Sequence, residues 1–125
     1  MPKSAVIIRE IAPPVGPYSP GIRVGEFLYL SGQVAQDPAT GKLIQGDVTA
    51  QTKQIFKNIE LLLEAGGKTV EDVVKVTVFL TDIREFAPMN DVYERQFSPP
   101  YPARTTVAVA ALPLSAAVEI DVIAT

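Results

Sequence analysis

The chain has 125 residues, a net charge of −3, and neither histidine nor cysteine. The absence of these two residue types excludes several common kinds of enzyme. Thiol nucleophiles, serine–histidine triads and ordinary zinc sites need those residue types. Carboxylates, arginine, lysine, tyrosine, hydroxyls and backbone amides remain as candidate catalysts. The acidic balance disfavours general electrostatic binding to nucleic acid. We expect a single domain over residues 1–125, large enough to form a core without disulfides or metal.

The hydrophobic content of 47% is high, yet no apolar run approaches the roughly 20 residues that span a bilayer. A buried interface between subunits explains the excess better than a membrane segment. Charged residues interrupt the N-terminal apolar stretch after a few positions, which does not fit a signal peptide. We therefore expect a cytoplasmic protein.

The first segments are a short strand over residues 5–10 and a loop over residues 11–21. Four prolines and two glycines in this loop exclude a helix and predict a fixed, extended conformation. Such a loop is either a plain connector or one wall of a binding site. Composition alone favours the connector.

A hairpin is predicted next, with strands over residues 22–24 and 27–34 around Gly25 and Glu26. Ser31 and Gly32 fall near the end of its second strand. The glycine permits close approach of another backbone or a ligand, and a β-bulge is the alternative explanation.

The clearest helix runs from about residue 48 to 65, with Asp47 as its N-cap and Gly66 just after its end. Apolar spacing predicts a buried stripe formed by Val48, Thr52, Ile55, Phe56, Ile59, Leu62 and Leu63. The charged residues Lys53, Lys57, Glu60 and Glu64 are best explained as its solvated face.

Residues 73–81 form the strongest predicted strand, apolar on both faces near its middle, as in a central strand. A second helix is predicted over about 88–97, with Pro88 in its first turn. This helix should bury Met89, Val92, Tyr93 and Phe97. Asn90 points elsewhere on it, and the proline-rich residues 98–102 end it.

The last segments, 102–113 and 114–124, are predicted to form a hairpin around Pro113 and Leu114. Alternation then places Arg104 and Thr106 on the same face as Glu119 and Asp121. The residues alone favour a cross-strand ion-pair network, within one chain or with a neighbouring subunit. The alternative is an anion site in which the arginine binds a carboxylate and Glu119 acts as base.

Together these segments predict an α+β fold with one sheet and two helices packed on one face of it. The other face has no cover within the chain. Self-association is the simplest way to cover it.

Several motifs in this order resemble the RidA family, also called YjgF or L-PSP. They are residues 16–20 (Gly-Pro-Tyr-Ser-Pro), 30–33 (Leu-Ser-Gly-Gln), the helix end at 58–66, Asn90 with Tyr93, and 102–107 (Pro-Ala-Arg-Thr-Thr-Val) through Glu119. The resemblance implies a chorismate-mutase-like fold and a homotrimer with its sites between subunits. It also implies hydrolysis of reactive enamines and imines, such as 2-aminoacrylate, 2-iminobutanoate and 2-iminopropanoate, to 2-keto acids and ammonia, without metal or organic cofactor.

By the same resemblance, Arg104 binds the substrate carboxylate and Glu119 positions the attacking water. Thr106 stands where some members carry cysteine and could donate a hydrogen bond to the substrate. The remaining pocket residues implied by the family are Tyr18, Ser31, Gly32 and Asn90. Other relatives resemble ligand-sensing or chaperone-like proteins, or ribonucleases that inhibit translation. The ribonuclease alternative fits poorly with an acidic chain that lacks histidine.

Overall fold

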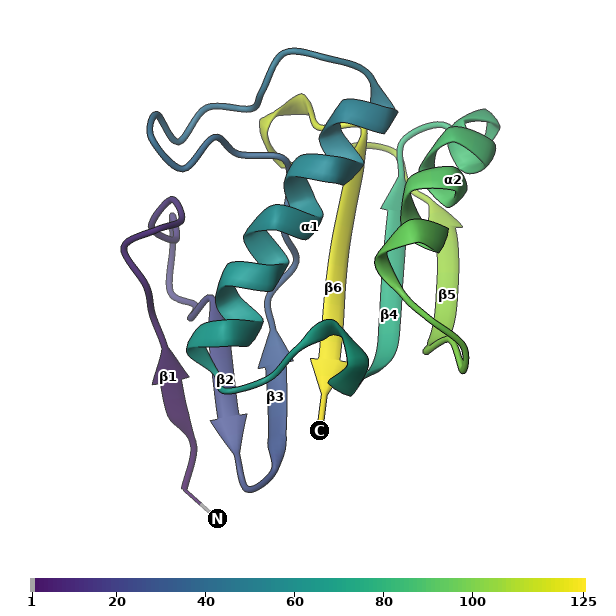
Figure 1. The fold of residues 1–125 in the computed structure, drawn as a ribbon. Helices are drawn as coiled ribbons and strands as arrows, with labels where there is room; N and C mark the ends of the chain where they lie inside the picture. Colours follow the sequence, from purple (N-terminus) through teal and green to yellow (C-terminus); the bar gives the residue numbers. More distant parts are fainter. Residues whose placement is uncertain (1) are drawn as a thin grey trace.

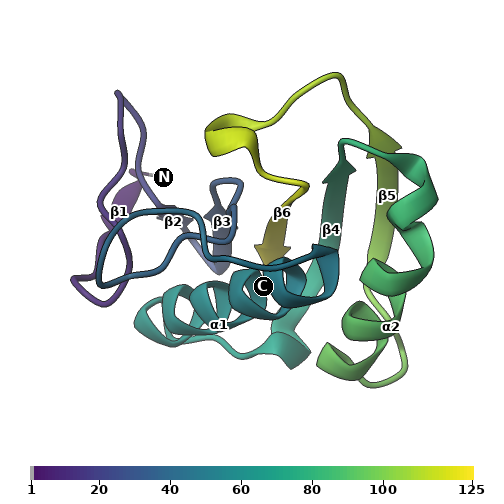
Figure 2. The same ribbon diagram turned by 90° about the horizontal axis from the view of Figure 1, so that it is seen from above.

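The computed structural model describes residues 2–125 as one mixed, six-stranded sheet in the order β1-β2-β3-β6-β4-β5. Two helices pack on the same face of the sheet, as the sequence predicted (Figures 1 and 2). The strands are β1 (Ser4–Val6), β2 (Gly21–Val24), β3 (Phe27–Leu30), β4 (Val73–Leu80), β5 (Ala103–Ala108) and β6 (Val118–Ala124). The helices are α1 (Val48–Ala65) and α2 (Phe86–Gln96), with short 3-10 turns η1 (Val70–Asp72), η2 (Ile83–Glu85) and η3 (Pro113–Ser115).

Helix α1 has the predicted bounds and buried stripe. The Asp47 carboxylate accepts a hydrogen bond from the Ala50 backbone N–H at 3.0 Å, which caps the first turn. All seven residues of the predicted stripe are buried, and the predicted charged face is exposed. The helix therefore packs by the apolar face that its period predicts.

Helix α2 begins two residues earlier than predicted. The side chain of Asp82 caps the turn η2, which runs directly into the helix at Phe86. Pro88 lies in the first helical turn, where backbone N–H groups have no intrahelical partner, so the missing N–H of proline costs no hydrogen bond. Met89, Val92, Tyr93 and Phe97 are buried, as expected.

Strand β4 is central, as predicted. It pairs with β6 on one side and with β5 on the other. Val76, Val78 and Leu80 are fully buried toward the helices. The predicted first hairpin is also present, as β2 paired with β3, although its second strand ends at Leu30 instead of Val34.

The predicted hairpin at the end of the chain is wrong. β5 pairs in parallel with β4, β6 pairs antiparallel with β4, and β4 lies between them. Helix α2 is the crossover that carries the chain from β4 to its parallel neighbour β5. Residues 109–117 then pass over the end of β4, through η3, to reach β6 on the far side (Figure 2).

The prediction that Arg104 and Glu119 lie on the same face of the sheet is also wrong. Residues in register across a sheet point to the same side. Arg104 is in register with Val76, which faces the helices, whereas Glu119 is in register with Phe79 on the open face. Within one chain the two side chains therefore lie on opposite faces of the sheet, two strand spacings or about 10 Å apart across it.

Within residues 2–125, neither α1 nor α2 lies on the open face (Figures 1 and 2), and the short turn η3 is drawn on that side in Figure 2. Phe27 and Tyr29 on β3 are each 43% exposed and Val107 on β5 is 38% exposed. Within residues 2–125, no helix combines the length and apolar character that crossing a membrane requires.

Candidate functional site

The site residues predicted from the sequence, together with Phe86 and Tyr93, fall into two groups in the fold. The arginine half-site comprises Phe86, Asn90, Tyr93, Arg104 and Thr106, between α2 and the edge strand β5. The glutamate half-site comprises Tyr18, Ser31, Gly32 and Glu119, around a cavity at the end of β3 and β6. The structure brings together the members of each group, but not the two groups within one chain.

The arginine half-site holds its guanidinium between aromatic rings. Phe86, Asn90 and Tyr93 share one face of α2, because they are spaced four and three residues apart. Arg104 donates a hydrogen bond from Nη1 to Asn90 Oδ1 at 2.7 Å. Its Cζ lies 4.5 Å from the centroid of the Tyr93 ring and 5.4 Å from that of Phe86. Such cation–π contacts fix the orientation of the fork without neutralising its charge.

No carboxylate of the same chain pairs with Arg104. In the part of the chain that the structure describes, residues 2–125, the one ion pair joins Arg84 and Asp82. The ion-pair network favoured by the sequence is therefore not present within the chain. A guanidinium has five N–H donors, and here its hydrogen bond is to Asn90. The other donors are available to an anion.

Two buried hydroxyls accompany this cation. Tyr93 Oη and Thr106 Oγ1 have no hydrogen-bond partner within the described residues. Burial raises the pKa of Tyr93, and the nearby positive charge of Arg104 opposes that shift only in part. The phenol therefore stays protonated at neutral pH, and both hydroxyls can donate or accept a hydrogen bond. A buried hydroxyl without a partner is uncommon and favours a polar ligand nearby.

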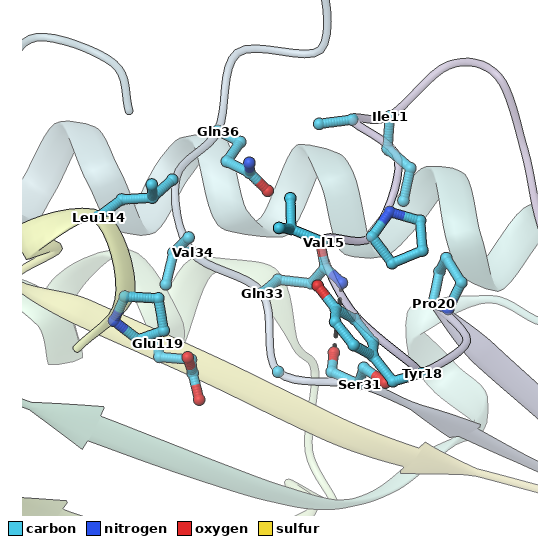
Figure 3. A pocket seen from close by; sticks show the side chains of 14 residues that line it. Ile11, Val15, Tyr18, Pro20, Ser31, Gln33, Val34, Gln36, Leu114 and Glu119 are labelled. Atoms are coloured by element: carbon cyan, nitrogen blue, oxygen red, sulfur yellow. Dashed lines mark hydrogen bonds between the residues drawn. The ribbon is translucent and has the colours of Figure 1, made fainter. Parts of the chain in front are cut away.

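The glutamate half-site surrounds a cavity of about 550 Å³. Its walls come from the loop before β2, the segment after β3, the turn η3 and Glu119 (Figure 3). The loop over 11–21 is thus a wall of a cavity, the less favoured of its two sequence interpretations. Tyr18 is 52% exposed at the cavity.

Ser31 ties this wall to the sheet. Its hydroxyl donates to the Ser19 carbonyl at 2.6 Å, and its backbone N–H donates to the Pro20 carbonyl at 2.9 Å. The serine side chain therefore has a structural partner, and its contribution to the cavity is to hold the loop in place (Figure 3).

Gly32 permits a close approach to Glu119. Gln33 and Ile120 exchange backbone hydrogen bonds of 2.8 and 3.0 Å, which draw this segment against β6. A Cβ atom at position 32 would lie 2.6 Å from Glu119 Oε2. The glycine is therefore explained by close approach of the Glu119 side chain, whereas the sequence predicted close approach of another backbone or a ligand.

The carboxylate of Glu119 is poised to accept a proton. Burial raises its pKa, and the neighbouring Asp121 raises it further. Burial also raises the pKa of Asp121, although Thr77 and Lys75 oppose that shift. A carboxylate with a raised pKa is a stronger base when ionised. Within residues 2–125, no cluster of three or more acidic side chains could hold a metal ion.

The sequence missed Phe86 and treated Tyr93 only as a core residue. Placing the helix start at Pro88 left Phe86 outside the helix, so its alignment with Asn90 and Tyr93 was hidden. A start at the Asp82 cap would have revealed the shared face.

Comparison with known proteins gives consistent matches over nearly the whole chain. A RutC family protein of Pyrococcus horikoshii is 48% identical over 95% of each chain. The 2-iminobutanoate/2-iminopropanoate deaminase of Dermatophagoides farinae is 40% identical over 97% of this chain and 95% of the relative. The crystal structure of E. coli TdcF with bound serine superposes with a TM-score of 0.90 at 34% identity, covering 98% of each chain.

Residues 9–125 match the sequence family described as "Endoribonuclease L-PSP". This match covers both half-sites and agrees with the motifs at Ser31, Gly32, Arg104 and Glu119. The chain therefore belongs to the L-PSP family, the YjgF, RutC or RidA family.

Proposed function

We propose that this protein hydrolyses reactive 2-imino acids and their enamine tautomers to 2-keto acids and ammonia. The observation that carries the proposal is the partly buried Arg104, held by Asn90 and aromatic rings and free of any carboxylate in its own described chain. A planar fork presented in this way suits a small carboxylate. The relative from Dermatophagoides farinae is named for this activity, and TdcF binds serine, a small amino acid with a carboxylate.

The active assembly in this proposal is a homotrimer of single-domain subunits. Because the two half-sites lie on opposite sheet faces, the arginine half-site of one subunit would meet the glutamate half-site of the next. A closed ring of head-to-tail contacts makes such composite sites by symmetry. Association would also cover the exposed apolar residues Phe27, Tyr29 and Val107.

In the reaction, Arg104 binds the substrate carboxylate with two parallel hydrogen bonds and so fixes the imine carbon. Glu119 of the neighbouring subunit accepts a proton from water as the water oxygen bonds to that carbon. Glu119 passes that proton to the imine nitrogen, which gives a carbinolamine. The hydroxyl proton is then transferred to the amino nitrogen, the carbon–nitrogen bond breaks, and ammonia leaves as the keto group forms. Water is the co-reactant, and no oxidant is needed.

The hydroxyls of Thr106 and Tyr93 and the wall around Ser31 complete the proposed pocket. Thr106 lies two residues from Arg104 on the same face of β5, so its unpartnered hydroxyl could bond the substrate. Tyr18, Gly32 and the amide of Asn90 would close the space around the reacting carbon.

The test generates 2-aminoacrylate or 2-iminopropanoate with an amino-acid dehydratase or oxidase and measures keto-acid release. We expect this protein to accelerate release above the spontaneous rate, and Arg104→Ala to remove that acceleration. Binding of a small keto acid without any acceleration would instead favour a ligand-binding regulator, the main alternative.

A further inference from the structure

The cavity of the glutamate half-site carries an unusual amount of exposed apolar surface. Val15 is 87% exposed and Leu114 is 51% exposed, and both line the cavity. The buried Ile11 lines the same cavity. Glu119 is the one charged residue among the described residues of the lining. Exposed apolar groups gathered around a concave site indicate a ligand with an apolar part.

Leu114 is held in this position by an uncommon backbone conformation. Its φ is 60° and that of Ser115 is 57°, in the left-handed region that leucine rarely adopts. The following residues anchor the turn, because Ala116 is buried and the Ala117 N–H donates to Gln51 Oε1 at 3.0 Å. An unfavourable conformation that the surroundings impose is a feature typical of functional sites.

Figure 3 shows the two sides of this apolar region. Leu114 extends from η3 on one side of the cavity, while Val15 and Ile11 lie on the loop opposite. Glu119 and Leu114 are both drawn on the left of this view, and Val15 and Ile11 lie to the right of them. The apolar region and the reacting group thus share one cavity.

We propose that Ile11, Val15 and Leu114 form a side-chain subsite that selects imino acids with branched or extended aliphatic side chains. This inference rests on the proposed function, since it assigns the substrate of the same site. The reacting imine and carboxylate occupy the space between Glu119 and the neighbour's Arg104. The substituent on the next carbon then extends toward the apolar part of the cavity, which the methyl group of 2-iminopropanoate is too short to fill. The reaction supplying this substrate would be a two-electron oxidation of an aliphatic amino acid by an oxidase, or β-elimination from an amino acid that carries a leaving group on its β-carbon.

The predicted preference is measurable as a ratio. An additional methylene in an apolar pocket improves specificity by about 10-fold or more. Because the leucine side chain has three carbons more than that of alanine, we expect the imine derived from leucine to be accelerated at least about 10-fold more than the imine derived from alanine. Both imines are generated by an amino-acid oxidase and compared at equal protein concentration, each against its own spontaneous hydrolysis.

Leu114→Asn is the informative variant. Asparagine adopts the left-handed conformation more readily than leucine, so the turn is retained while the apolar side chain is removed. The ratio of the two accelerations should fall about 10-fold. Val15→Thr, which keeps the side-chain shape, should lower the ratio in the same direction. The matched control is Val74→Asn, at an exposed apolar residue on β4 that does not line the cavity, and it should keep the wild-type ratio.

A binding measurement supplies an independent readout of the same preference. Calorimetric titration with pyruvate and 4-methyl-2-oxopentanoate should show tighter binding of the larger keto acid, and Leu114→Asn should remove the difference. Equal acceleration of both imines, or a ratio unchanged in Leu114→Asn, would overturn the subsite while leaving the deaminase function standing. No acceleration of either imine would overturn the proposed function and the subsite with it.

Discussion

The surroundings of the charged side chain differ between the two half-sites. The guanidinium of Arg104 lies against the rings of Phe86 and Tyr93 and donates to the neutral amide of Asn90, and no carboxylate of the described residues pairs with it. Glu119 lies where burial and Asp121 both disfavour its ionised form. The first environment preserves a permanent cation for binding, and the second prepares a carboxylate to take up a proton.

The separation of these half-sites by the sheet explains why Arg104 and Glu119 do not neutralise one another within a single chain. If Arg104 and Glu119 lay side by side, they would form an ion pair, and the pKa of Glu119 would be lowered. Their placement on opposite faces keeps them apart within a chain and brings them together only through a neighbour. In the proposed trimer, each site would therefore depend on assembly.

Removing the arginine should have the largest effect. Loss of a charge-assisted pair with a substrate carboxylate costs about 2–5 kcal/mol, or roughly 30- to 4000-fold in rate. Arg104→Ala should therefore lose nearly all acceleration of imine hydrolysis. Arg104→Lys keeps the charge but loses the planar fork, and should recover only part of it. Retention of a near-normal rate in Arg104→Ala would refute the carboxylate role.

Replacing the glutamate should lower the rate by about 100-fold, the lower end of the range for general base catalysis. Glu119→Gln keeps the size of the side chain and should affect keto-acid binding less than turnover. The raised pKa of Glu119 also determines how this residue affects the free energy of unfolding. The contribution of Glu119 to stability is present at low pH and is lost as pH rises through the folded-state pKa. The melting temperature of Glu119→Gln at neutral pH should therefore not be lower than that of wild type. An unchanged turnover number would remove Glu119 from the mechanism.

Mixing the two variants tests whether the half-sites meet between subunits. Subunits carrying Arg104→Ala retain Glu119, and those carrying Glu119→Gln retain Arg104. Random assortment into trimers should restore roughly a quarter of the wild-type sites if each site takes one residue from each subunit. The control mixes Arg104→Ala with the double variant in one chain, which cannot restore a site. No recovery in the first mixture after co-refolding would contradict the composite site.

Gly32→Ala should have a smaller effect, about 10-fold on rate. The added Cβ would lie 2.6 Å from Glu119 Oε2, so the carboxylate must move from its present position. The backbone conformation at Gly32 accepts alanine, and the displaced group is the end of a flexible side chain, so we expect little loss of melting temperature. Gly41→Ala adds a Cβ that would meet no atom within 4 Å but strains a backbone with φ +73°, so it should lower the melting temperature and leave the rate unchanged. A normal rate in Gly32→Ala would show that the position of Glu119 is not critical.

The elements set by local pattern could be predicted, and the pairing of distant strands could not. Helix α1 carries its own cap at Asp47 and its own apolar period, so its bounds were correct. The sheet face to which Arg104 points is set by the insertion of β4 between β5 and β6. The alternation of apolar and polar residues within β5 and β6 does not indicate that β4 lies between them. For the same reason Arg104 and Glu119 could be identified by type and motif, while their separation required the fold.

The smallest expected effect concerns the pH dependence of Glu119. Only the ionised carboxylate can accept a proton, so activity should fall as pH is lowered through a pKa that burial and Asp121 hold above the usual value. Asp121→Asn removes the neighbouring negative charge and should lower the pKa of Glu119, which moves the acidic limb of the kcat/KM profile to lower pH. The shift should be partial, because burial is the larger cause and remains in the variant. Lys75 acts on the pKa of Asp121 and is not among the causes of the shift at Glu119, so Lys75→Met is a charge-changing control that should move the limb less than Asp121→Asn does. A limb that stays in place in Asp121→Asn would show that Asp121 does not set the charge state of the catalytic carboxylate.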